Sequence, residues 1–125
     1  MLVTLFWVAC LINLVYEILH SVLYTTCLNA SWKTYAYLML KGALFDGTVI
    51  TIFFATTYTF FKEYYIAPFI IISLAFAYIW EVYSLKKGTW EYSEHMPTVF
   101  LVDVTPLIQL AATGMGAIYI TMYIL

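Results

Sequence analysis

Arginine is absent from the sequence, and charged residues of all kinds make up only 10% of its 125 residues. A typical soluble domain is about 25% charged, so this composition excludes an ordinary soluble globular domain, and its high apolar content excludes a disordered chain. A nucleic-acid-binding protein needs a basic surface to neutralise phosphates, whereas this chain has a net charge of −2. We therefore expect no nucleic-acid partner.

Cysteine is scarce too. Cys10 and Cys27 are the only two cysteines, too few for the disulfide framework of a small secreted protein. The sequence has no glycine-rich phosphate loop and no nucleophile elbow. Without arginine it also has no bidentate group for tight binding of phosphates or carboxylates. These absences argue against nucleophilic catalysis and against phosphate recognition.

Hydrophobic residues, in contrast, make up 65% of the chain, and the mean hydropathy is +0.93. They form four long apolar segments, which run roughly over residues 2–24, 35–61, 66–85 and 97–125. Each is long enough to cross a hydrocarbon core about 30 Å thick as a helix, and none alternates as a barrel strand does. The sequence predicts an all-α integral membrane protein, in which an antiparallel bundle of four transmembrane helices forms a single domain over residues 1–125. The first segment lacks a basic start and a cleavage site, so we expect a retained helix.

The lysines predict an orientation for this bundle. Four of the five lie on or near the first and third connectors, at Lys33, Lys41, Lys86 and Lys87, and only Lys62 lies on the opposite side. Because lysine is enriched in cytoplasmic loops, we expect these two connectors in the cytoplasm and both termini on the non-cytoplasmic side of a multi-pass membrane protein.

Ionisable residues interrupt every apolar segment. An ionisable group inside the membrane costs several kcal/mol unless it is paired or hydrated, and it is a functional candidate for that reason. The five are Glu17, His20, Asp46, Glu81 and Asp103. Because successive helices run in opposite directions, all five fall in the same half of the membrane. In the first segment, a polar stripe shares one helical face: Cys10, Asn13, Glu17, His20 and Tyr24.

This one-sided polar set predicts acid–base chemistry. Carboxyl groups and an imidazole gathered in an apolar site can serve as general acid and general base. The leading hypothesis is a membrane-embedded enzyme that isomerises, hydrates or cyclises a lipid or isoprenoid, with Glu17, His20, Asp46, Glu81 and Asp103 as catalytic residues. Five further residues are expected to contact the substrate: Asn13, Tyr24, Trp90, His95 and Gln109.

Other functions stay open at this point. The same carboxyl groups would suit a small oligomeric proton-coupled transporter, or a structural subunit of a membrane complex whose polar layer fixes the helix register. Glu17 and His20 also have the Glu-x-x-His spacing found in metal-binding helical bundles, so a metal ion held by these two and nearby carboxylates is a further alternative. Because a second such motif is absent, we favour a site without a metal or other cofactor.

Two features of the last segment predict packing. Ala112 and Gly116 have the spacing that lets transmembrane helices approach closely, which suggests a homo-oligomer contacting through this face, with membrane lipids as the other partners. Pro106 lies within the segment and is expected to kink its helix near Asp103.

Overall fold

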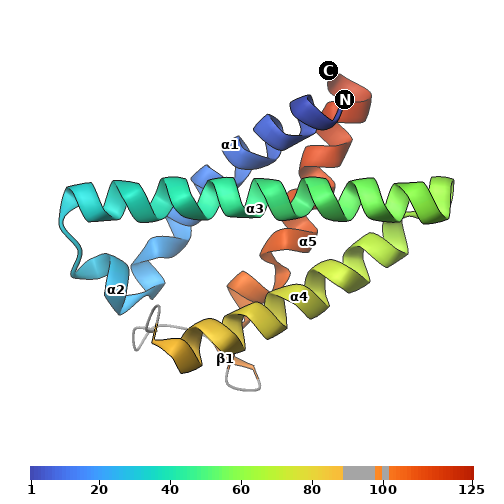
Figure 1. The fold of residues 1–125 in the computed structure, drawn as a ribbon. Helices are drawn as coiled ribbons and strands as arrows, with labels where there is room; N and C mark the ends of the chain where they lie inside the picture. The colour runs from blue at the N-terminus through green and yellow to red at the C-terminus, as the bar shows by residue number, and fades with distance from the viewer. Residues whose placement is uncertain (89–97, 100–101) are drawn as a thin grey trace.

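The structure, a computed structural model, describes residues 1–88, 98–99 and 102–125 and consists mainly of four long helices (Figure 1). They are α1 (Leu2–His20), α3 (Trp32–Phe61), α4 (Ile66–Lys87) and α5 (Val104–Tyr119). With the short helical turns that extend three of them, all four are long and apolar enough to cross a membrane. The predicted all-α, four-helix membrane bundle is confirmed.

Short elements connect the long helices. A 3-10 turn η1 (Ser21–Leu23) and a single helical turn α2 (Thr25–Leu28) join α1 to α3, and a 3-10 turn η2 (Lys62–Tyr64) joins α3 to α4. A π-helical turn η3 (Ile120–Ile124) follows α5. The strands β1 (Thr98–Val99) and β2 (Val102–Asp103) pair in antiparallel fashion just before α5.

Local signals explain where α3 and α4 begin and end. The Ser31 side chain accepts a hydrogen bond of 3.3 Å from the backbone N–H of Thr34, so it caps the N-terminus of α3. The helix therefore begins at Trp32, three residues before the predicted start at 35. At the other end Lys62 adopts a positive φ of 51°. After α4, Gly88 has a φ of 77° and a ψ of 20°, the left-handed conformation that ends many helices.

The last helix begins later than the sequence predicted. The expected start was residue 97, but α5 begins at Val104, and residues 98–99 and 102–103 form strands instead. Asp103 therefore precedes the fourth helix and is not inside it. Pro106 is the third residue of α5, within the first turn, where backbone N–H groups have no partner in the helix and a proline is tolerated. The predicted kink at Pro106 was wrong for this reason; Pro97, expected at the helix start, lies outside the described residues.

α3 and α4 lie close together at one end of the bundle and far apart at the other (Figure 1). The tight turn η2 joins α3 and α4, and the two helices then diverge (Figure 1). α1 packs mainly against α3, and α4 packs mainly against α5. The two termini lie together at one end (Figure 1), where η3 contacts α1. The divergent ends of α3 and α4 lie beside the connector η1–α2.

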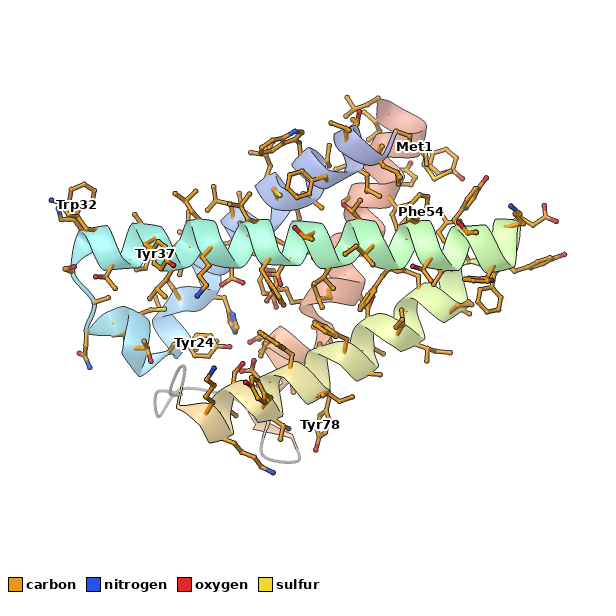
Figure 2. The ribbon with its side chains drawn as sticks, viewed as in Figure 1. Met1, Tyr24, Trp32, Tyr37, Phe54 and Tyr78 are labelled. Atoms are coloured by element: carbon orange, nitrogen blue, oxygen red, sulfur yellow. The ribbon has the colours of Figure 1, made fainter. Side chains whose placement is uncertain are left out.

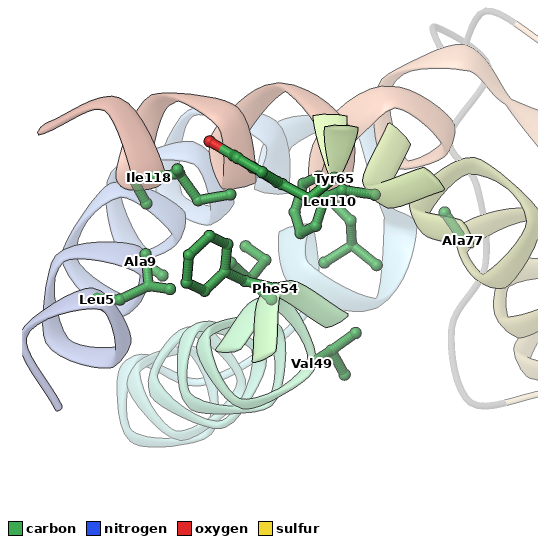
Figure 3. Close-up of a cluster of buried hydrophobic side chains, with 11 residues drawn as sticks. Leu5, Ala9, Val49, Phe54, Tyr65, Ala77, Leu110 and Ile118 are labelled. Carbon is green, nitrogen blue, oxygen red and sulfur yellow. The ribbon is translucent and has the colours of Figure 1, made fainter. Parts of the chain in front are cut away.

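A dense apolar core fills the half of the bundle near the termini. It includes Leu5, Ile50, Phe54, Phe69 and Ile118, each no more than 1% exposed (Figure 3). Close helix contacts make this packing possible. A Cβ atom at Gly47 would stand 2.4 Å from the Cys10 sulfur, and a Cβ atom at Gly114 would stand 2.5 Å from the Phe69 ring. The small residues therefore bring α1 against α3, and α5 against α4.

Candidate functional site

A cavity of about 290 Å³ lies between the divergent halves of α3 and α4 and is bounded by α1, the α2 connector and α5. Its volume is at the lower end of the range of ligand pockets, about 300–1,000 Å³. Most of its wall is apolar, and several polar groups face it. The polar and ionisable lining residues are Glu17, His20, Tyr24, Thr26, Cys27, Lys41, Asp46, Glu81 and Gln109.

Two carboxyl groups meet at one wall of the cavity. The amide nitrogen Nε2 of Gln109, on α5, donates to Oε1 of Glu17 at 2.9 Å and to Oδ2 of Asp46 at 2.8 Å. Glu17 is on α1 and Asp46 on α3, so a single side chain joins carboxyl groups from two other helices. Because one nitrogen atom bonds to both, the two carboxyl groups are close neighbours. We refer to Glu17 and Asp46 as the carboxyl pair.

A buried polar layer behind the pair holds Gln109 in place. Oδ1 of Asn13 lies 3.0 Å from the Gln109 amide nitrogen and 3.1 Å from the Thr113 hydroxyl. The amide carries two protons for three nearby oxygens, those of Asn13, Glu17 and Asp46. The Thr113 hydroxyl has two acceptors within reach, Asn13 Oδ1 and the Gln109 backbone carbonyl at 2.6 Å, and the latter bond holds the Gln109 turn of α5. Asn13 is 0% exposed, and its own amide donates to the Ala9 carbonyl at 2.8 Å. The layer therefore supports the carboxyl pair from the side away from the cavity.

A third carboxyl group comes from α4. Glu81 is only 3% exposed, and the phenol of Tyr24 donates to its Oε1 at 3.1 Å. Tyr24 extends from the connector after η1 toward α4 (Figure 2). Its backbone is extended, with φ −110° and ψ 126°, because α1 ends at His20 and does not continue to residue 24 as predicted.

His20 is positioned by the start of α5. Its imidazole hydrogen-bonds to the Thr105 hydroxyl, and its ring lies 5.5 Å from that of Tyr16 and 5.0 Å from that of Tyr24, centre to centre. The phenol of Tyr16 donates to the Thr105 carbonyl at 2.6 Å. Tyr16 and His20, both on α1, therefore hydrogen-bond to Thr105 in the first turn of α5, and these bonds hold His20 at the cavity wall.

An aromatic stack forms the outer part of the cavity. The rings of Phe45 and Trp80 are 4.9 Å apart at an angle of 25°, and those of Phe76 and Trp80 are 5.9 Å apart at 9°. All three side chains line the cavity, and Trp80 remains 37% exposed on the outer surface. We call these three residues the aromatic wall. Lys41 lines the same region and is also exposed, so the cavity reaches the surface between α3 and α4.

Cys27 lies in the connector helix α2, outside the membrane-spanning segments, and its side chain lines the cavity. Burial, and to a lesser degree the negative charge of Glu17, raise the pKa of its thiol. A thiol with a raised pKa is neutral at physiological pH and therefore a poor nucleophile. Cys27 thus contributes to the wall, in keeping with the absence of nucleophile motifs in the sequence.

Most of the predicted site residues converge on this cavity. The six that line it are Glu17, His20, Tyr24, Asp46, Glu81 and Gln109. Asn13 lies behind the carboxyl pair and does not line it. Trp90 and His95 fall outside the described residues, as does the side chain of Asp103. Within the described ranges, no group of three or more histidine, cysteine, aspartate or glutamate side chains is arranged to hold a metal ion.

The sequence did not single out several residues that shape the site. Thr105 and Thr113 carry no local signal, because their roles depend on contacts with α1, more than 80 positions away in the chain. The aromatic wall had a detectable signal: Phe76 and Trp80 are four residues apart, and Trp80 directly precedes Glu81. The sequence was compared with family models, curated proteins and solved structures, and nothing matches it.

Proposed function

We propose that the protein is a membrane-embedded acid–base enzyme that acts on an unsaturated lipid or isoprenoid. The observation that carries the proposal is the carboxyl pair, held by the Gln109 amide at the wall of a largely apolar cavity. Two neighbouring carboxyl groups can hold one proton between them, which leaves an acid and a base side by side. Apolar surroundings and an opening between α3 and α4 suit a substrate that arrives from the bilayer.

The chemistry needs no cofactor. The protonated member of the carboxyl pair donates its proton to one carbon of a double bond, and a carbocation forms at the other carbon. The ionised member then removes a proton from a neighbouring carbon, which shifts the double bond. The two groups have now exchanged roles, and transfer of the proton from one neighbouring carboxyl group to the other restores the starting state. Attack on the cation by water, which gives up a proton to the ionised member, would give hydration. Attack by a second double bond, followed by loss of a proton from the resulting cation to the same member, would give a ring.

The packing of the other half of the bundle favours an enzyme over a transporter. A transport path must continue to the opposite side of the membrane, but Phe54 and Phe69 are at most 1% exposed between the helices there. Tyr65 packs edge-on against Phe54, with ring centres 5.4 Å apart. The cavity therefore ends at the aromatic core, as expected for a binding site with a single opening.

Hydrogen exchange at carbon tests the proposal. The purified protein is reconstituted in phosphatidylcholine vesicles in heavy water with a panel of uncharged polyprenols and unsaturated hydrocarbons, and carbon-bound deuterium is measured by mass spectrometry. We expect incorporation with the wild type and a loss of at least about 100-fold in Glu17→Gln and in Asp46→Asn, the usual contribution of a general acid or base.

Glu63→Gln is the matched control. Glu63 is an exposed carboxylate in η2, at the end of α3 away from the carboxyl pair, and its amide variant should exchange at the wild-type rate. The proposal is wrong if the wild type labels no substrate in the panel, or if Glu17→Gln and Asp46→Asn label substrates as fast as Glu63→Gln does.

A further inference from the structure

The cavity is shaped to receive a positive charge on a lipophilic molecule. Three helices each contribute one carboxyl group to its wall, from Glu17, Asp46 and Glu81. Of the described lining residues, only Lys41 carries a fixed positive charge. Its ammonium nitrogen lies 5.8 Å from the ring centre of Tyr37, a residue that is 61% exposed and does not line the cavity. The lysine charge is thus directed toward the outer surface.

A glycine makes room for one carboxyl group at the cavity wall. Gly42 lines the cavity on α3, and a Cβ atom at this position would stand 3.3 Å from Cδ of Glu17. The Glu17 carboxyl group therefore lies close against α3 at this position, and a side chain at residue 42 would force it to move. Glu17 itself lines the cavity, where a ligand group can approach it.

The aromatic wall gives the cavity an apolar surface in addition to its carboxyl groups. The stacked rings of Phe45, Phe76 and Trp80 offer an apolar surface for a hydrocarbon body, and aromatic π systems also attract cations. At about 290 Å³, the cavity holds a compact head and the first part of a chain. The rest of the chain can leave between α3 and α4, where Trp80 and Lys41 reach the surface.

We infer that this cavity binds single-chain lipophilic ammonium compounds, with the ammonium group at the carboxyl groups and the first part of the chain against the aromatic wall. The inference rests on the proposed site, whose substrate would become cationic on protonation, but it does not require turnover. A bound ammonium ion would represent the carbocation stage of the proposed reaction.

A comparison of two isosteric probes tests this inference. Radiolabelled dodecyldimethylammonium and the hydrocarbon of the same shape, with C–H in place of N–H, are titrated into vesicles of phosphatidylcholine with and without the wild-type protein. Since phosphatidylcholine carries no net charge, the difference between the two vesicle preparations reports binding to the protein. We expect saturable binding of the ammonium probe, at least about tenfold tighter than binding of the hydrocarbon, as one charge-assisted contact provides. Equal or non-saturable binding of the two probes would overturn the inference.

Variants locate the bound charge. The double variant Glu17→Gln/Asp46→Asn should lose the preference for the ammonium probe, and Glu63→Gln should keep it. Gly42→Val keeps every carboxyl group in the chain but displaces that of Glu17, so it should weaken ammonium binding by about tenfold or more. If Gly42→Val and the double variant both bind the ammonium probe as the wild type does, the ligand lies elsewhere and the inference fails. Ammonium binding without deuterium exchange would contradict only the proposed reaction.

Discussion

Gln109 shows how the role of a single side chain depends on its neighbours. The sequence suggested a contact with substrate, and the structure places it at the cavity but commits its amide to the carboxyl pair. Buried carboxyl groups without hydrogen-bond donors are costly. A neutral amide supplies two donors without adding a charge, so Gln109 makes it feasible for Glu17 and Asp46 to lie together in an apolar bundle.

Replacing Gln109 with leucine should therefore destabilise the protein. Leucine has a similar size but leaves two half-buried carboxyl oxygens without their donor, so we expect a loss of about 1–3 kcal/mol in all. The midpoint of thermal unfolding in detergent micelles, followed by circular dichroism, measures the loss. Thr48→Val is the control, because the exposed Thr48 hydroxyl bonds only to a carbonyl of its own helix. Equal midpoints for the two variants would show that the amide does not support the carboxyl pair.

Sequence reasoning found the depth of the polar residues but not their partners. Depth follows from counting along an apolar segment, and this count placed Glu17, Asp46 and Glu81 at one level. The partner of each group depends on how the helices are rotated about their axes and how closely they approach. Those quantities are set by distant contacts, such as that between His20 and Thr105.

At the scale of helices, hydropathy identified four spans but placed the start of the last one, at residue 97, well before the observed start at Val104. Residues 99–102 are all apolar, and the single charged residue Asp103 separates them from α5, so hydropathy averaged over a span does not distinguish them from the helix. Pro106 was the better marker, since a proline is tolerated in the first turn of a helix and α5 begins two residues before it. The composition was enough to predict the helical class, whereas the start of α5 is indicated by the backbone preference of one residue, Pro106.

Replacing a glycine with alanine should have opposite effects on stability at Gly47 on α3 and at Gly116 on α5. A Cβ atom at Gly47 would stand 2.4 Å from the Cys10 sulfur and 3.2 Å from the Phe6 carbonyl oxygen, whereas one at Gly116 would meet nothing within 4 Å. Gly47→Ala should push α1 away from α3 and destabilise the protein by about 1–3 kcal/mol. Gly116→Ala should stabilise α5 slightly, by up to about 1 kcal/mol, because alanine has the higher helix propensity.

Unfolding of both glycine variants in the same detergent, with chaotrope titration, measures the difference. Gly47→Ala should also reduce deuterium exchange, because the displaced helices carry Glu17 and Asp46. If the two variants shift the unfolding midpoint alike, the close crossing of α1 and α3 is wrong. A destabilised Gly116→Ala variant would instead point to a contact of this open face with a second copy, as the sequence suggested for Ala112 and Gly116.

The whole molecule is divided into two unlike halves. Apolar and aromatic side chains close the half near the termini, while the other half holds the cavity, the carboxyl groups and four of the five lysines. The lysine positions, Lys33 and Lys41 near the start of α3 and Lys86 and Lys87 at the end of α4, predict that this half faces the cytoplasm. The cavity would then open toward the cytoplasmic leaflet, and its substrate would arrive from that leaflet.

Reporter fusions in a bacterial inner membrane test this orientation. Alkaline phosphatase joined after Leu125 should be active, because it folds only outside the cytoplasm, and green fluorescent protein at the same position should be dark. A fusion after Gly88, next to Lys86 and Lys87, should give the reverse, and one after Glu63 should behave as the fusion after Leu125 does. Since α4 separates the Glu63 and Gly88 positions, a bundle that spans the membrane must give them opposite signals. The inverted pattern at all three positions would place the cavity in the outer leaflet and refute the lysine-based orientation, while identical signals after Glu63 and Gly88 would refute the crossing of α4 itself.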